Sequence, residues 1–258
     1  MKAVKVIVVL LILVVAGGML ALNMGKKVDV TWTTADYDSA MAKAKVNLDN
    51  RSTVGLESLA LGRFTTSGRV SIDESFTSAE VTSVIAINDP AGAFTDTKVK
   101  FGTDGQGEVS FKVSKDFIDK VKNDPNLRNR ILAQIPADGP RTLEQLLVAV
   151  IFSSAQTDLT GFTVDLLTGL AAGKPIYASG RLARSSSNSV EINVTSVRVG
   201  MISLPDETLR QVEYHTEQFV NNLISPENGF DIQELNVVDG KIYYKGTLPA
   251  EIRGTQLP

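Results

Sequence analysis

The sequence predicts an α+β protein in which an N-terminal transmembrane helix precedes a long curved antiparallel sheet packed on helices. The first observation is an uncharged, apolar run at residues 6–25. The second is a set of segments in which apolar and polar residues alternate between turn sequences, as in strands. The third is a set of segments with apolar residues three and four apart, which indicates helices. We therefore expect a membrane anchor at 1–27, a stalk or linker at 28–67 and an α+β domain at 68–258.

The composition excludes several kinds of site. The 258 residues include no cysteine and one histidine, which excludes thiolate metal sites, a cysteine nucleophile and any site with two imidazoles. Residues 1–27 hold four of the 26 basic side chains and no acid, which leaves 22 basic against 29 acidic side chains, a net charge of −7, in residues 28–258. The overall field of such a body does not attract nucleic acid, although local patches can differ.

The apolar run is long enough to cross a membrane. Its 20 residues carry no charge, and a helix that rises about 1.5 Å per residue spans a hydrocarbon core of about 30 Å over that length. A cleaved signal peptide is the alternative, since it also begins with basic residues and an apolar stretch. The length of the run, and residues 21–24 without a small-x-small cleavage site, favour an uncleaved anchor.

The orientation of the anchor follows from what comes after it. No second run of this length is present, because the apolar stretch at 146–152 has seven residues. Lys2 and Lys5 flank one end of the anchor and Lys26 and Lys27 the other, so the positive-inside count is nearly balanced. We expect a single-pass protein of the cell membrane whose long C-terminal domain is extracytoplasmic.

The domain begins with a strand and a capped helix. Val70 and Ile72 alternate with polar residues and predict the strand. Thr77 and Glu80 match a capping box, in which the threonine hydroxyl accepts the Glu80 N–H and the glutamate reaches back. The apolar face expected on this helix holds Val81, Val84 and Ile85.

A hairpin is predicted next. Phe101 and Phe111 belong to alternating segments that flank the sequence GTDGQG at 102–107. A glycine-rich loop of this kind can cradle phosphate, but this one joins two alternating segments. Asp104 and Gly105 provide the positive φ angles of a tight turn, so we interpret it as a plain hairpin.

The last third of the chain repeats this order of elements. Alternating segments around Ile176 and Ile192 are joined by a turn at 185–189. A long helix is expected from 205–207, because proline suits a first turn and the two acids complement the helix dipole. Its apolar stripe consists of Leu209, Val212, Phe219, Val220 and Leu223. A final hairpin is expected to turn at 239–240.

Two regions have weaker patterns. Residues 123–173 are predicted to form an insertion of mainly helical character, with apolar segments at 146–152 and 162–170 that must cover the sheet or a partner. Residues 28–67 contain alanine-rich helical material without a strong period.

Two sequence segments and the anchor together carry a resemblance. The segment FTSAEV at 76–81 opens the first helix, and VRVGMISLP at 197–205 leads into the long one. With the anchor, they resemble the YpmS-like proteins, single-span extracytoplasmic proteins of Gram-positive bacteria. The resemblance covers residues 1–25 and about 68–250. It implies a fold similar to the tubular lipid-binding (TULIP) superfamily, in which a curved sheet wraps a long helix and a groove can hold acyl chains. It implies no catalytic residues.

Signatures of catalysis are missing from the sequence. It contains no nucleophile elbow, Walker A loop or dinucleotide fingerprint. His215 titrates near neutrality when unperturbed, but it lies at the edge of the long helix's stripe. Glu213 and Glu217 are close to it in sequence, yet neither is four residues away, and we interpret His215 as a surface or boundary residue. Acidic pairs such as Asp73 and Glu74 lack the spacing of a calcium loop. We expect no enzyme activity, no cofactor and no metal site.

Without catalytic or metal signatures, the apolar surface of the domain is the feature that indicates a function. We expect the ectodomain to bind one lipid or other long apolar ligand between the sheet and its helices, because each buried methylene contributes about 0.8 kcal/mol. The residues expected to face the ligand are Val84, Ile85, Phe101, Phe111, Val212 and Phe219. Each of these side chains can equally pack in a closed core. The alternative is a non-catalytic envelope scaffold that docks a protein partner through a sheet edge or the inserted helices.

Overall fold

The computed structural model describes residues 28–45, 64–87, 94–116, 119, 123–124, 173, 175–199, 202–204 and 206–254. Within these ranges no helix is both long and apolar enough to cross a membrane. The run at 6–25, expected to be the anchor, lies outside the described residues, as does nearly all of the expected insertion at 123–173.

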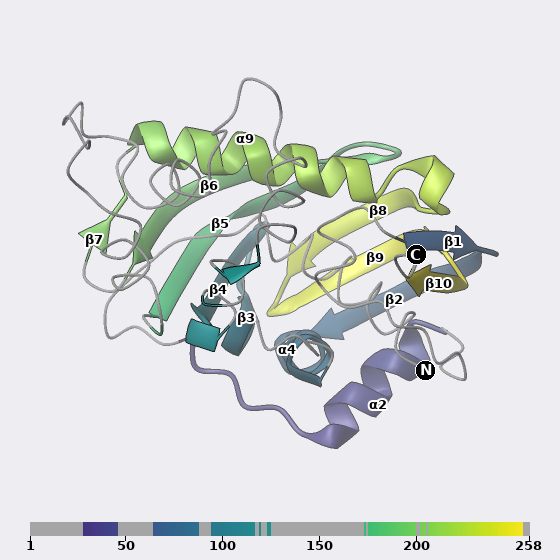
Figure 1. The fold of residues 1–258 in the computed structure, drawn as a ribbon. Coiled ribbons are helices and arrows are strands. Elements are labelled where there is room, and N and C mark those ends of the chain that lie inside the picture. The colour runs from purple at the N-terminus through teal and green to yellow at the C-terminus, as the bar shows by residue number, and fades with distance from the viewer. Residues whose placement is uncertain are drawn as a thin grey trace.

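The described chain is an α+β fold with antiparallel sheets, as expected (Figure 1). Its elements are α2 (Thr34–Lys43), β1 (Phe64–Ser67), β2 (Val70–Thr77), α4 (Ser78–Ile87), β3 (Phe94–Phe101), β4 (Gln106–Val113), β5 (Pro175–Ser186), β6 (Ser189–Val199), β7 (Ile202–Ser203), α9 (Asp206–Leu223), a 3-10 turn (Pro226–Asn228), β8 (Asp231–Val238), β9 (Lys241–Leu248) and β10 (Glu251–Gly254). In place of one long sheet, the described strands form three, with orders β3-β4-β5-β6-β7, β2-β9-β8 and β1-β10.

The local signals in the sequence are confirmed. The Thr77 Oγ1 accepts the Glu80 N–H at 3.1 Å, and the Glu80 carboxylate accepts the Thr77 N–H at 2.7 Å, so the capping box begins α4. The β3–β4 turn has Asp104 at φ 52° and Gly105 at φ 78°. The β8–β9 turn has Asp239 and Gly240 at φ 51° and 76°. Two consecutive positive φ angles are what a two-residue hairpin turn needs.

The five-stranded and three-stranded sheets are joined through the β3–β4 turn. The Gly105 N–H donates to the Val237 carbonyl of β8 at 2.9 Å, and the Gly105 carbonyl accepts the Leu182 N–H of β5 at 3.0 Å. At the other end of the boundary between β5 and β8, the Ile232 N–H donates to the Ser187 carbonyl at 2.8 Å. The turn predicted as a plain hairpin therefore also bridges two sheets.

Helix α9 covers the edge of β6 that β7 leaves open. The contacts are the Val194 N–H to Glu213 Oε2 at 2.7 Å, the Ile192 N–H to Glu217 Oε2 at 3.1 Å and the Val190 N–H to Asn221 Oδ1 at 2.9 Å. Four residues of helix advance about 6 Å and two residues of strand about 6.6 Å, so side chains four apart meet alternate N–H groups. The helix runs antiparallel to the strand, and its polar side chains take the place of a neighbouring strand.

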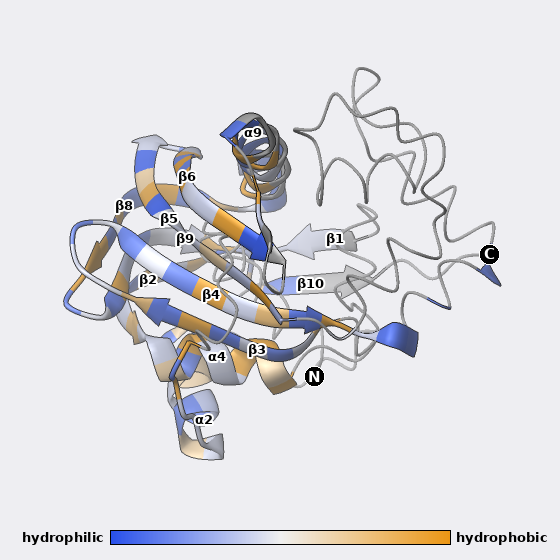
Figure 2. Ribbon diagram, turned by 90° about the vertical axis from the view of Figure 1, so that its left-hand side faces the viewer, coloured by the Kyte–Doolittle hydropathy of each residue, from blue (hydrophilic) through white to orange (hydrophobic). Residues whose placement is uncertain are grey.

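Helix α4 covers the opposite edge of the same sheet in the same way. Thr82 Oγ1 accepts the Val99 N–H at 2.9 Å and donates to the Val99 carbonyl at 3.2 Å. Ser78, four residues earlier, accepts the Phe101 N–H at 2.9 Å. Figure 2 shows α9 and α4 at opposite ends of the strand layer. Covering an edge with a helix blocks pairing with another chain.

A substitution in α9 tests this edge cover. We expect Glu217→Ala to lower the free energy of unfolding by about 1–3 kcal/mol, because the Ile192 N–H loses its acceptor. Glu217→Gln keeps an acceptor oxygen and should cost less. The matched control is Gln218→Ala on the exposed side of α9. Urea unfolding measures the stability of all three variants. An equal loss in Glu217→Ala and Gln218→Ala would contradict the claim that α9 covers the edge of β6.

Helix α2 lies within the range expected to be a stalk or linker, yet it packs on α4 (Figure 1). It is capped by Thr33 and Asp36 in a second capping box. Its buried side chains, Tyr37, Ala40 and Met41, join the core. The packed domain therefore begins before residue 68.

Candidate functional site

One face of the five-stranded sheet holds the core, and we call it the inner face. Residues paired across the sheet share a face, and the inner row Val99, Val109, Ala178 and Val197 follows from the register. These four side chains are 0%, 3%, 0% and 5% exposed. The opposite face, which carries Lys100 and its cross-strand neighbours, is called the outer face.

The inner face becomes less buried toward the C-terminal end of β4. Phe111, two residues after Val109, and Ile176, its direct partner in β5, are only half-buried. Phe94 on β3 is 38% exposed and stands edge-on to the Phe111 ring, with centroids 5.2 Å apart. Apolar side chains that are continuous with the core thus reach solvent at this end of the sheet.

Helix α9 adds two more half-buried apolar side chains beside the core. Leu209 and Val212 pack against the core without being fully buried. Because α9 runs antiparallel to β6 and Glu213 binds the Val194 N–H, Val212 lies about level with Val194 and Leu209 about level with Ser196. From Ser196, β6 continues three residues to Val199, which pairs with Ile176. We call the set Phe94, Phe111, Ile176, Leu209 and Val212 the open apolar end.

The residues expected to face a ligand divide into three groups. Val84 and Ile85 in α4 and Phe101 in β3 are fully buried in the core, where α4 packs on β3. Phe111 and Val212 belong to the open apolar end. Phe219 lies in α9, but its side chain is outside the described residues, as is the side chain of His215.

The open apolar end includes three residues that the sequence-based ligand set omitted. The sequence predicted Ile176 in a strand and Leu209 in a helix stripe, and Phe94 is the first residue of β3. Apolar periodicity predicts which side of a helix or strand faces inward. It does not predict how completely neighbouring elements cover that side. The register that places Ile176 beside Phe111 joins segments separated by more than 60 residues, and local sequence carries no signal for it.

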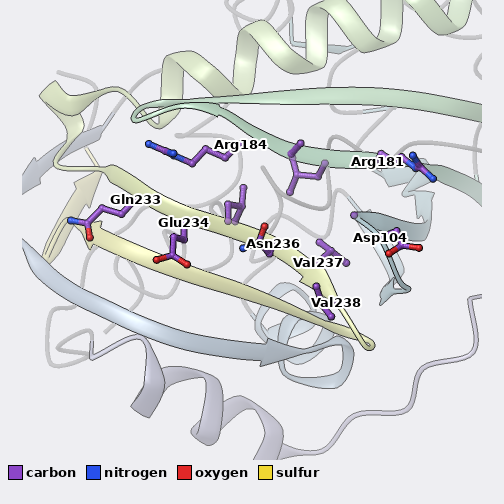
Figure 3. Close-up of a pocket in the computed structure, with 12 residues that line it drawn as sticks. Asp104, Arg181, Arg184, Gln233, Glu234, Asn236, Val237 and Val238 are labelled. Atoms are coloured by element: carbon purple, nitrogen blue, oxygen red, sulfur yellow. The ribbon is translucent and has the colours of Figure 1, made fainter.

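A groove of about 550 Å³ with polar and apolar lining runs between β5 and β8 (Figure 3). Its lining includes Arg181 and Arg184 from β5, Glu234 and Asn236 from β8, and Asp104 from the β3–β4 turn. Figure 3 shows the two arginines pointing toward opposite ends of the groove. The Arg184 Nε–H donates to the Ile232 carbonyl at 2.8 Å, so this side chain helps to join the sheets.

The turn at one end of this groove has little capacity for phosphate. The Gly105 N–H donates to Val237, and the Gln106 N–H donates to the Thr103 carbonyl at 2.9 Å. The Gly102 N–H donates to the Gln106 carbonyl at 2.9 Å. A phosphate cradle needs N–H groups that point freely into the loop, so the interpretation as a hairpin is confirmed.

Titratable clusters offer no alternative site in the described part of the chain. No group of three histidine, aspartate or glutamate side chains is placed there to hold a metal ion. Among the described residues, Glu80 is the most buried carboxylate, with 4% of its surface exposed. It accepts hydrogen bonds from Ser39 and Lys43 of α2, which makes it a packing contact between helices.

Three comparisons with known proteins give no match. No family model, no curated protein and no solved structure matches it significantly.

Proposed function

We propose that the protein is a single-span, membrane-anchored extracytoplasmic protein that binds the apolar part of a lipid at the open apolar end. The proposal includes a fold similar to the TULIP superfamily, in which the sheet and α9 hold the ligand. The resemblance of residues 76–81 and 197–205 to the YpmS-like proteins supports this arrangement.

The observation that carries the proposal is the change in burial along the inner face. The row through Val109 is closed, whereas the next row, with Phe111 and Ile176, is half-buried. Acyl methylenes placed against this second row extend an existing core, and each contributes about 0.8 kcal/mol when buried. Such a site needs few polar groups, which agrees with the lack of a polar ligand motif in the sequence.

The uncharged run at 6–25 supports a lipid as the occupant. A domain held at a bilayer by this run meets lipid at high local concentration. The alternative is a scaffold that docks a protein partner through a sheet edge or the inserted helices. It has less support at the five-stranded sheet, because α4 and α9 cover β3 and β6 with hydrogen-bonding side chains.

Photo-cross-linking in liposomes tests the proposal with the full-length chain. With a phospholipid that carries a photoactivatable acyl chain, we expect cross-links in peptides that contain Phe111, Ile176 or Val212. Val212→Glu should reduce these cross-links about tenfold, because a carboxylate is costly against acyl chains. Cross-links to residues 6–25 serve as an internal standard for insertion.

The matched control is Val238→Glu. Val238 is 54% exposed on β8, away from the open apolar end, and the same substitution there should leave the cross-links unchanged. Thermal unfolding of both variants separates loss of binding from loss of fold. Cross-links confined to residues 6–25, or lost equally in both variants, would sink the proposal.

A further inference from the structure

A second groove, of about 380 Å³, lies on the outer face of the five-stranded sheet. Its polar lining comes from four adjacent strands and consists of Lys100, Gln106, Glu108, Ser179, Arg181 and Thr195. Hydrophilic and hydrophobic residues alternate along β3 and β4 in Figure 2, as expected for strands with one face packed and one face polar. The groove is therefore separate from the open apolar end.

The strand register brings three hydrogen-bond donors together in this groove. Gln106 of β4 lies directly opposite Arg181 of β5. Lys100 of β3 lies opposite Glu108, so it is the diagonal neighbour of Gln106. Directly opposite side chains have Cβ atoms about 5 Å apart and diagonal ones about 7 Å. Lys100 and Arg181 thus flank one amide side chain across three strands.

None of these three side chains is engaged elsewhere among the described residues. Lys100, Gln106 and Arg181 form no hydrogen bond or ion pair through their side chains within that part of the chain. An arginine and a lysine without partners, one on each side of the same amide, have hydrogen-bond donors available for an anion.

The remaining polar groups of the groove already have hydrogen-bond partners. The Tyr177 hydroxyl donates to the Glu108 carboxylate. The Ser179 and Thr195 hydroxyls are 3.0 Å apart, and Thr195 also donates to the Ser179 carbonyl at 3.0 Å. The two cations and the amide are thus the groups available to a ligand, and with Glu108 the groove has a net charge of +1.

We propose that this groove binds a phosphate group. The planar guanidinium of Arg181 matches two phosphate oxygens, Lys100 supplies a point charge and the Gln106 side-chain N–H supplies a neutral donor. The Glu108 carboxylate opposes the ligand and limits its affinity. A lipid headgroup and free phosphate present the same chemistry, and the site is independent of lipid binding at the inner face.

Isothermal titration of the full-length chain in an uncharged detergent tests the site with two probes, inorganic phosphate and glycerophosphoglycerol. Tighter binding of inorganic phosphate assigns the groove to free phosphate, and tighter binding of the diester assigns it to a headgroup. In either case Arg181→Gln and Lys100→Gln should each weaken binding about tenfold, since each removes a charge-assisted hydrogen bond. Absence of binding of both probes at millimolar concentration would overturn the proposal.

Two further variants distinguish a built site from general charge. Lys98→Gln removes the same charge from the same face of β3, two residues from Lys100 and outside the groove lining, and should change the affinity less than about twofold at physiological salt. Glu108→Gln should tighten binding about fivefold, because it removes the opposing charge and keeps an acceptor for Tyr177. An equal loss in Lys98→Gln and Lys100→Gln, or weaker binding in Glu108→Gln, would contradict the assigned geometry.

Discussion

Gly246→Ala is expected to lower the free energy of unfolding by about 4 kcal/mol or more, the largest effect of any single substitution considered for this chain. Gly246 lies in β9 at φ 153°, and an added Cβ would be 1.8 Å from the Asp231 carbonyl oxygen. That oxygen belongs to backbone of β8, next to the register shift between Ile232 and Glu234. The Tyr244 hydroxyl also donates to it at 2.9 Å, so the strand has little freedom to move away.

The control for this prediction is Gly240→Ala in the turn of the same hairpin. Gly240 has φ 76°, but the nearest atom to its added Cβ is 3.8 Å away. We expect only the cost of a left-handed conformation, about 1–2 kcal/mol. Urea unfolding followed by circular dichroism measures both variants. Equal stability of the two would mean that β8 does not approach β9 as described.

The second large effect is expected at Glu80. Its carboxylate accepts hydrogen bonds from the Ser39 hydroxyl at 2.5 Å and from the Thr77 N–H at 2.7 Å. It also forms an ion pair with Lys43 Nζ at 2.6 Å. Glu80→Ala removes the capping box and leaves Lys43 without its carboxylate partner. We expect a loss of about 3 kcal/mol in the free energy of unfolding. Asp38→Ala, at an exposed position of α2, is the control and should have little effect.

The stability contributed by Glu80 should depend on pH. Burial raises the pKa of Glu80, but the hydrogen bonds from Lys43, Ser39 and Thr77 outweigh burial and hold the pKa below its ordinary value of 4.5. A carboxyl with a lowered folded pKa stabilises the fold in full above its unfolded pKa, and the contribution is lost as the pH falls through the folded pKa. The difference between the wild type and Glu80→Gln in urea unfolding should therefore shrink below about pH 4.5. A difference that stays constant down to pH 3 would be inconsistent with a charged Glu80 in the folded protein.

Sequence reasoning succeeded where structure depends on a few neighbouring residues. The capping box at Thr77 and Glu80 and the turns at 104–105 and 239–240 are local features, and all three are confirmed. The long helix begins at Asp206, where the sequence placed its first turn. In each case a side chain or a positive φ angle acts on backbone within four residues.

Features that depend on contacts distant in sequence were missed. The sequence pattern marks Glu213 and Glu217 only as neighbours of His215, yet their carboxylates accept hydrogen bonds from N–H groups of β6. Acidic side chains four apart beside an apolar stripe were the available signal. Gly246, in an alternating strand, was a similar signal, because glycine in a strand often marks a close approach of backbone.

The apolar ligand set shows the same limit. Helical spacing placed Val84 and Ile85 on the inner side of α4, and that side is closed by β3. The predicted apolar face of α4 consists of Val81, Val84 and Ile85, whereas the polar residues Glu80, Thr82 and Ser83 are buried as well. Whether an apolar side chain lies in a core or at an opening depends on what packs over it, and periodicity within one element does not contain that information.

The most direct test of the central claim is native mass spectrometry of residues 28–258 purified from cells without detergent. This fragment keeps every residue that the structure describes, beginning with the buried Val28. If the open apolar end binds lipid, the mass of the protein exceeds its sequence mass by that of one lipid, and Val212→Glu removes the excess. A ligand-free mass, together with no uptake of fluorescent phospholipid, would contradict the claim.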